Sequence, residues 1–235
     1  MKLIYSVLLI FSAQLQAEAQ QNEWSVQIPS GIFSFRGTGS TSSSSYIVSD
    51  VASIPNYTNN PYGTGSAYSY GLVINYQRNT KSNLIFGFQT GYESFSSKEK
   101  VDQVFAPGLS STAVKEGKTI LTNRFINFHP FIGKRISRLR SIDTDLTFGF
   151  DFAPCLSSTE HATVETSSGV KYTTTLERHK PSPDFRLRID LTNYYKKFGL
   201  CLGYSYGLTN YTEGIIGQGG GVYSQLIRIG IAYRF

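Results

Sequence analysis

Two histidines and three carboxylates that could exchange protons lie in or beside one polar stretch of the chain: Asp151, Glu160, His161, His179 and Asp184. A histidine oriented by a carboxylate can act as a general base. Their spacing fixes no geometry, however, and no nucleophile motif surrounds them. We therefore expect solvated side chains and no catalytic residue. The alternative is a rim enzyme that acts on lipid or protein through His161 or His179.

A larger set of charged side chains alternates with apolar ones. Arg186 and Arg188, for example, alternate with Leu187 and Ile189. A charge removed from water needs a partner, so this pattern predicts an enclosed network of ion pairs that blocks flow. A narrow channel or proton path is the alternative. The predicted luminal network comprises Glu93, Asp143, Asp145, Asp151, Asp184, Arg186, Arg188, Asp190, Arg228 and Arg234.

Neighbouring segments suggest which of these charges meet. Asp143, Asp145 and Asp151 share one alternating row, and the next alternating segment carries Arg186 and Arg188. Side chains on one face of adjacent strands are close enough to interact. We therefore expect the three carboxylates to contact these two guanidinium groups.

The remaining chemistry is sparse. Cys155 and Cys201 fall at different heights in the strand assignment below, beyond the reach of a disulfide, so we expect two free thiols. Metal-ligand spacings of His and Cys are absent. The run 219–221 is three glycines, but it precedes a strand rather than a helix and so does not resemble a phosphate-binding loop. We expect no metal and no cofactor.

The elements that would position these groups are strands. In Tyr223–Phe235 one row is mostly apolar with aromatic ends, and the other is small or cationic. Successive strand residues point to opposite faces, so this segment has one apolar and one polar face. Eight segments alternate in this sense: Trp24–Arg36, Ala67–Gln77, Leu84–Glu93, Ile120–Gly133, Ile142–Phe152, Asp184–Thr192, Phe198–Leu208 and Tyr223–Phe235.

The connections alternate between short turns and long loops. Turns such as Asn79–Asn83 are short, whereas Gly37–Gly65, Ser96–Thr119, Pro154–Ser182 and Thr209–Val222 are long. This asymmetry is typical of outer-membrane barrels. We predict an all-β fold, an eight-stranded antiparallel up-and-down transmembrane β-barrel with short periplasmic turns and long extracellular loops. A soluble lipocalin-like barrel or β-sandwich, with the apolar row inside, is the alternative.

Two positions interrupt the pattern. Pro130 cannot donate to a strand ladder, so we expect a bulge or a short break there. In the first strand Phe33 and Phe35 compete with Ile32 for the apolar face. A bulge at Gly31 would bring both sets onto one face.

The chain begins with the features of a secretion signal. Lys2 precedes the apolar run Leu3–Phe11, and Ala17-Glu18-Ala19 forms a small-x-small cleavage site. We predict a signal peptide over residues 1–19, cleaved after Ala19, and one outer-membrane β-barrel domain over residues 20–235. The expected location is the cell outer membrane.

The loops suggest partners. Residues 37–65 are rich in Ser, Asn, Tyr and Gly, which suits either a recognition loop or disorder. Basic residues on the outer side would attract lipopolysaccharide phosphates, so the net charge of +6 requires no nucleic acid. An outer-membrane protein partner would make the chain a subunit of a secretion or transport assembly. The outer-side basic residues are Lys98, Lys100, Lys115, Lys118, Arg178 and Lys180.

The signal peptide, the eight alternating segments and two motifs resemble the PorT-like outer-membrane β-barrel family of Bacteroidota. The motifs are the Pro-containing stretch Asn127–Arg135 and the closing strand Ile227–Phe235. The resemblance implies a small eight-stranded barrel but no single activity, because fold does not define function. The terminal Tyr233 and Phe235 are the expected signal for the barrel-assembly machinery during insertion.

Overall fold

The computed structural model describes residues 21–108, 111–139, 142–215 and 219–235. The predicted signal peptide and its cleavage site lie outside the described residues. Within the described part of the chain, no helix has the length and apolar character needed to span a bilayer.

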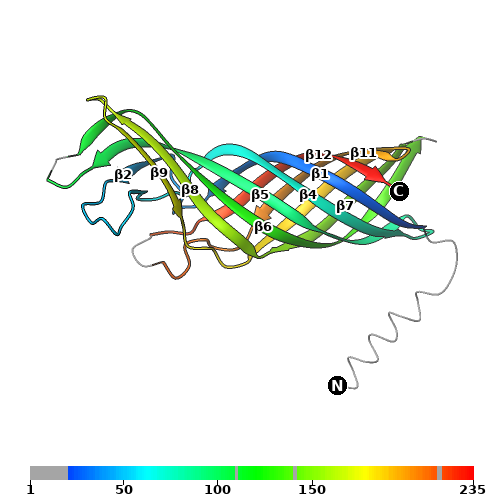
Figure 1. Ribbon diagram of the computed structural model, residues 1–235. Helices are drawn as coiled ribbons and strands as arrows, with labels where there is room; N and C mark the ends of the chain where they lie inside the picture. The colour runs from blue at the N-terminus through cyan, green and yellow to red at the C-terminus, as the bar shows by residue number, and fades with distance from the viewer. Residues whose placement is uncertain (1–20, 109–110, 140–141, 216–218) are drawn as a thin grey trace, which may run out of the picture.

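Eight strands form a closed antiparallel ring, which confirms the predicted fold (Figure 1). The first and last strands pair from Ser25–Arg234 to Arg36–Tyr223 and close the ring. In ring order the strands are β1 (Gln21–Arg36), β4 (Gly65–Asn79), β5 (Leu84–Phe105), β6 (Thr112–Leu139), β7 (Ile142–Ala153), β10 (Asp184–Tyr195), β11 (Phe198–Gly207) and β12 (Tyr223–Arg234).

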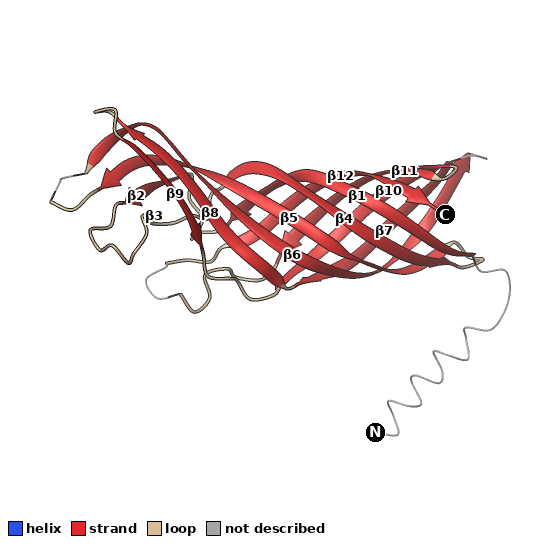
Figure 2. Cartoon of the chain, in the orientation of Figure 1, coloured by secondary structure: helices blue, strands red, loops and turns tan. Residues whose placement is uncertain are grey.

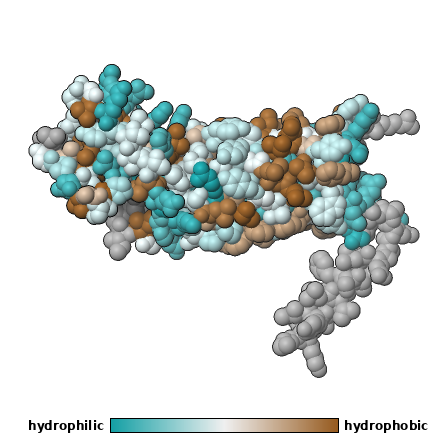
Figure 3. Space-filling model, viewed as in Figure 1, coloured by the Kyte–Doolittle hydropathy of each residue, from teal (hydrophilic) through white to brown (hydrophobic). Residues whose placement is uncertain are grey.

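The outer wall of the ring is apolar. Ile189 on β10 is 47% exposed, while its neighbours Arg188 and Asp190 are almost entirely buried. The same alternation holds in β12, where Ile227, Ile229 and Ile231 lie on one face and are all exposed. In Figure 3 hydrophobic residues gather over the wall and hydrophilic ones toward both ends. A ring with charges inside and an exposed apolar belt is a membrane-spanning barrel, not the soluble alternative.

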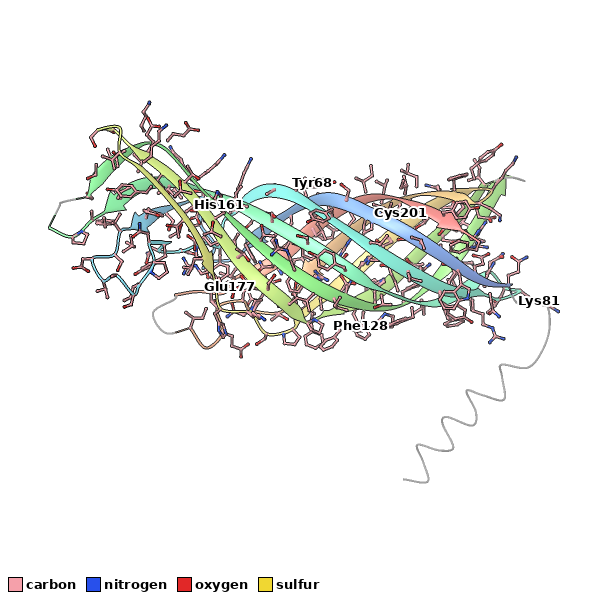
Figure 4. The ribbon with its side chains drawn as sticks, in the orientation of Figure 1. Tyr68, Lys81, Phe128, His161, Glu177 and Cys201 are labelled. Carbon is pink, nitrogen blue, oxygen red and sulfur yellow. The ribbon has the colours of Figure 1, made fainter. Side chains whose placement is uncertain are left out.

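Two short turns at one end require left-handed backbone. Asn83 has a φ of 63° in the turn between β4 and β5, and Lys196 has a φ of 57° in the turn between β10 and β11. Asn tolerates this region better than most residues. Figure 4 shows Lys81 at this end of the barrel, opposite His161 and Glu177 at the other.

The long connections contain strands that the sequence pattern did not reveal. β5 and β6 continue far beyond the barrel, and four further strands extend the sheet on either side of them (Figure 2). These are β2 (Ser43–Ile47), β3 (Tyr57–Thr58), β8 (Cys155–Thr166) and β9 (Lys171–Glu177). Of the four, β2 pairs with β5 and β8 with β6, while β3 pairs with β2 and β9 with β8. We call this sheet the extension. Its own apolar core contains Tyr46, Val101, Val104, Ala162 and Val164.

The two expected irregularities have different outcomes. The bulge expected at Gly31 is wrong, because β1 pairs with β12 in unbroken register. Phe33 and Phe35 instead point inward, where both are buried. At Pro130 a short break is present: pairing of β6 with β7 is missing between Phe128 and Phe131 and resumes in the same register.

Candidate functional site

The periplasmic end of the lumen is filled by ion pairs centred on Arg135. Its guanidinium donates two hydrogen bonds of 2.7 Å to Glu23 and bonds of 2.7 and 2.8 Å to Asp145. Arg234 reaches Glu23 at 3.2 Å and Asp143 at 2.9 Å. Paired, forked contacts of this kind are the strong geometry for arginine and carboxylate.

A second group of ion pairs lies farther along the lumen. Arg186 Nε is 3.0 Å from Asp151 and its Nη2 is 3.2 Å from Glu93. Arg228 binds the same Glu93 at 3.0 Å. All four side chains are nearly or completely buried. Charges held so far from water need several opposite partners, and each of these side chains has at least two.

Three further members of the expected network adjoin this group. Arg188 Nε lies 2.6 Å from Asp190, and its Nη1 donates to Gln89 at 2.7 Å. Asp184 lies 3.6 Å from Arg186 Nη1 and accepts a hydrogen bond from Tyr211 at 2.7 Å. The structure therefore places all ten expected residues on the inner face, in two separate groups.

The expected partners of Asp143 and Asp145 are wrong. Asp151 does contact Arg186 and Arg188, but Asp143 and Asp145 pair with the periplasmic arginines. Strand rise explains the separation: Asp145 lies six residues from Asp151 along β7, which is about 20 Å. Charged side chains on adjacent strands therefore form two separate groups, because they lie at different heights along the barrel.

Apolar side chains close the lumen above the second ionic group. Phe33, Phe35, Phe95 and Phe125 pack together inside the barrel mouth. The rings of Phe33 and Phe95 stack with centroids 5.2 Å apart, and Arg186 Cζ lies 4.9 Å from the Phe95 centroid. This apolar cap lies between the buried charges and the extension.

A small polar cavity separates the two ionic groups. Its volume is about 30 Å³, and His129, Gln89 and Cys201 contribute to its lining. That is room for about one water molecule. Cys155 and Cys201 are free thiols, as predicted.

The candidate rim residues do not assemble into an acid–base site. Glu160 and His161 are adjacent on β8 and therefore face opposite sides of the sheet: Glu160 is buried, with Arg178 Nε at 2.5 Å, while His161 is exposed beside Thr175. His179 lines a separate cavity of about 340 Å³. No carboxylate in the described residues pairs with either histidine. Nor do the described residues contain a cluster of three metal-ligating side chains.

Glu99 is the most unusual carboxylate of the extension. It is 3% exposed, and neither of its oxygens has a hydrogen-bond partner within the described residues. Burial is the main cause that raises the pKa of Glu99 from 4.5 to about 8, and the nearby charges of Glu160 and Asp102 contribute to the same rise. Folding therefore favours the protonated form of this acid.

Replacing Glu99 by Gln should remove a pH dependence of stability. Because the folded pKa exceeds the ordinary value of 4.5, the native state binds the proton more tightly, and wild-type stability falls as pH rises from about 4.5 to about 8. Glu99→Gln should raise the unfolding free energy by about 1–3 kcal/mol near pH 9 and change it little near pH 4.5. Urea midpoints at the two pH values measure this. Parallel pH profiles for both proteins would contradict it.

Several important residues were missed in the sequence. Glu23 and Arg135 continue the inward rows beyond the ends chosen for the first and fourth segments, so the same alternation could have found them. Phe33 and Phe35 are apolar residues on a polar row, for which alternation alone gives no signal. Glu99 lies in a stretch expected to be loop.

The fold resembles small outer-membrane barrels of known structure. Ail, the attachment invasion locus protein of Yersinia pestis, aligns at 10% identity over 92% of this chain and 99% of its own, with a TM-score of 0.37; that structure contains the heparin analogue sucrose octasulfate. Neisserial surface protein A aligns at 13% identity over 93% and 100%, with a TM-score of 0.38. No protein-family model and no curated protein matches this chain, so the PorT-like resemblance stays a prediction.

Proposed function

We propose that this protein is a non-enzymatic outer-membrane barrel, closed to flow, that holds the extension outside the cell as a binding surface. The observation that carries the proposal is the continuity of β5 and β6 from a filled barrel into a sheet with its own apolar core. Such a sheet is fixed to its membrane anchor without a flexible hinge.

The filled lumen supports a role other than transport. Two ionic groups, a one-water cavity and the apolar cap occupy successive heights of the interior. An eight-stranded barrel is only wide enough for its own side chains. Purified protein in planar bilayers should therefore show no conductance above background, and steady single-channel openings would contradict the closed state.

The outer face of the extension presents a basic surface. Lys100 lies directly opposite Lys118 in the β5–β6 ladder, and both are exposed. Like charges placed opposite each other destabilise a sheet, and a bound anion would relieve that repulsion. Lipopolysaccharide phosphate is the anion that we propose for this pair.

One feature of the sheet supports a protein partner as well. In the described sheet the order ends at β3 and β9, so each leaves one backbone edge without a neighbouring strand. An exposed edge is a template for a strand from another protein. The extension would then dock a subunit of an outer-membrane assembly. During insertion, Tyr233 and Phe235 on the closing strand are the proposed recognition signal for the assembly machinery.

Capture of tagged protein from its own outer membrane in mild detergent tests the binding surface. The double variant Lys100→Gln, Lys118→Gln should retain less lipopolysaccharide than wild type, because both charges of the opposed pair are gone. Lys81→Gln, at the periplasmic turn, is the matched control. Equal retention by all three proteins would contradict the basic surface. A stoichiometric protein retained by all three would instead favour the assembly role.

A further inference from the structure

A groove lies on the lipid-facing wall near the extracellular end of the barrel. Its volume is about 110 Å³. Ser34 and Gln225 lie opposite each other on β1 and β12, and Gln225 Nε2 donates to Ser34 Oγ at 2.9 Å. The lining residues are Ile32, Ser34, Ser66, Tyr204, Gln225, Leu226 and Ile227. Ser34 and Ser66 occupy positions where the outer wall otherwise carries large apolar side chains. Their small side chains leave the groove open.

A fixed cation stands directly above this groove. Arg36 is two residues beyond Ser34 on β1 and therefore points to the same face. Its Nη2 donates to the carbonyl oxygen of Gly207 at 2.5 Å, and its Cζ lies 3.6 Å from the ring centroid of Tyr206 and 5.0 Å from that of Tyr223. The two rings and the carbonyl hold the guanidinium in one orientation.

Arg36 has no counterion among the residues that the structure describes. No carboxylate of the described residues forms an ion pair with it, and its Nε is buried without a hydrogen-bond partner. A cation on the wall of a barrel is costly in the hydrocarbon region and tolerated at the interface, where lipid phosphates lie. The position and the missing counterion together indicate an anionic lipid headgroup.

We propose that this groove, with Arg36 above it, binds one molecule of lipid A, the bisphosphorylated and acylated anchor of lipopolysaccharide. Arg36 takes one phosphate, and an acyl chain lies against Ile32 and Ile227, which are 50% and 54% exposed. A second cation is available on the same rim: Lys98 on β5 is exposed and pairs with Gly65 of β4, the strand beside β1. Two cations above an apolar wall suit two phosphates above acyl chains.

The inference rests on the proposed outer-membrane location but uses residues separate from Lys100 and Lys118. Its rival is an arginine that reaches the interface without choosing a lipid. The proposal and its rival differ in whether lipid binding depends on the shape of the groove. An arginine that only reaches the interface does not need the groove beside Ser66.

Native mass spectrometry in a non-ionic detergent, with added bisphosphorylated lipid A, distinguishes them. We expect a one-to-one adduct with wild type. Arg36→Gln should weaken it about tenfold, which corresponds to about 1.4 kcal/mol. Ser66→Leu, which fills the groove at an exposed position and leaves Arg36 intact, should also weaken it. Lys134→Gln removes an exposed cation near the opposite rim and should leave it unchanged.

Three results would contradict the proposal. The first is that Lys134→Gln weakens the lipid A adduct as much as Arg36→Gln does. The second is that Arg36→Gln and Ser66→Leu both bind lipid A like wild type, and the third is that phosphatidylglycerol gives an equally stable adduct. The Lys100→Gln, Lys118→Gln variant keeps the groove intact. It should therefore retain the lipid A adduct even if the proposed basic surface proves wrong, so the two failures are distinguishable.

Discussion

Replacing Arg186 by Met should destabilise the barrel by about 3–5 kcal/mol, the cost of leaving a buried ion without its partner. Arg186 is completely buried and contacts Glu93, Asp151 and Asp184 at 3.2, 3.0 and 3.6 Å. Its loss leaves these carboxylates with fewer cations and no access to bulk water. Methionine fills much of the same volume, so packing contributes little to the change.

Urea unfolding from lipid vesicles measures this effect. Trp24, the single tryptophan of the chain, is 53% exposed on the wall and reports on its lipid contact. The double variant Arg186→Met, Glu93→Gln removes one charge of each sign and should recover part of the lost stability. If Arg186→Met alone unfolds at the wild-type urea concentration, the lumen is hydrated and the ion pairs do not fix the barrel.

Replacing Ile189 by Arg should cost about 2–4 kcal/mol of folding into lipid, because the residue lies on the outer face near the middle of β10. Its neighbours across the ladders are Phe148 and Tyr204, which are also exposed on the wall. A guanidinium at this position would lie in the hydrocarbon region of the bilayer, where lipid offers it neither a counterion nor a hydrogen-bond acceptor.

A charge placed outside the bilayer supplies the control. Thr173→Arg adds the same side chain at an exposed position of β9 in the extension, where surface substitutions change stability by about 0.5 kcal/mol or less. Folding yields of the two variants into vesicles give the comparison. Equal yields for Ile189→Arg and wild type would mean that this face does not contact lipid.

Much of the barrel was predictable from the sequence, because the bilayer restricts which residues a membrane-spanning strand can carry on each face. Lipid requires an apolar outer row, and side chains alternate every second residue, so the faces of β10 and β12 can be read directly. The same rule failed at Phe33 and Phe35. In this barrel the lumen is closed at its mouth by apolar side chains. The local sequence pattern cannot distinguish an inward-facing Phe from a bulge that moves the apolar row to the other face.

The extension was hidden for a related reason. Outside the bilayer a strand need not carry an apolar row toward its surroundings, so in β5 the outward residues Lys98 and Lys100 and the inward Glu99 are all charged. Alternation of apolar and polar residues then gives no signal. Pairing with β2 and with the long β6 makes this segment a strand.

The sequence alone therefore determined most of the strand faces, the alternation of turns and long connections, and most of the charges that must lie inside. Only the tertiary structure decided which of those charges meet. Asp145 pairs with Arg135 and Asp151 with Arg186 because the register of each strand against its neighbours fixes the height of every side chain. The groove beside Arg36 has the same origin: its lining residues come from four strands, and no single strand carries a sequence pattern that would reveal it.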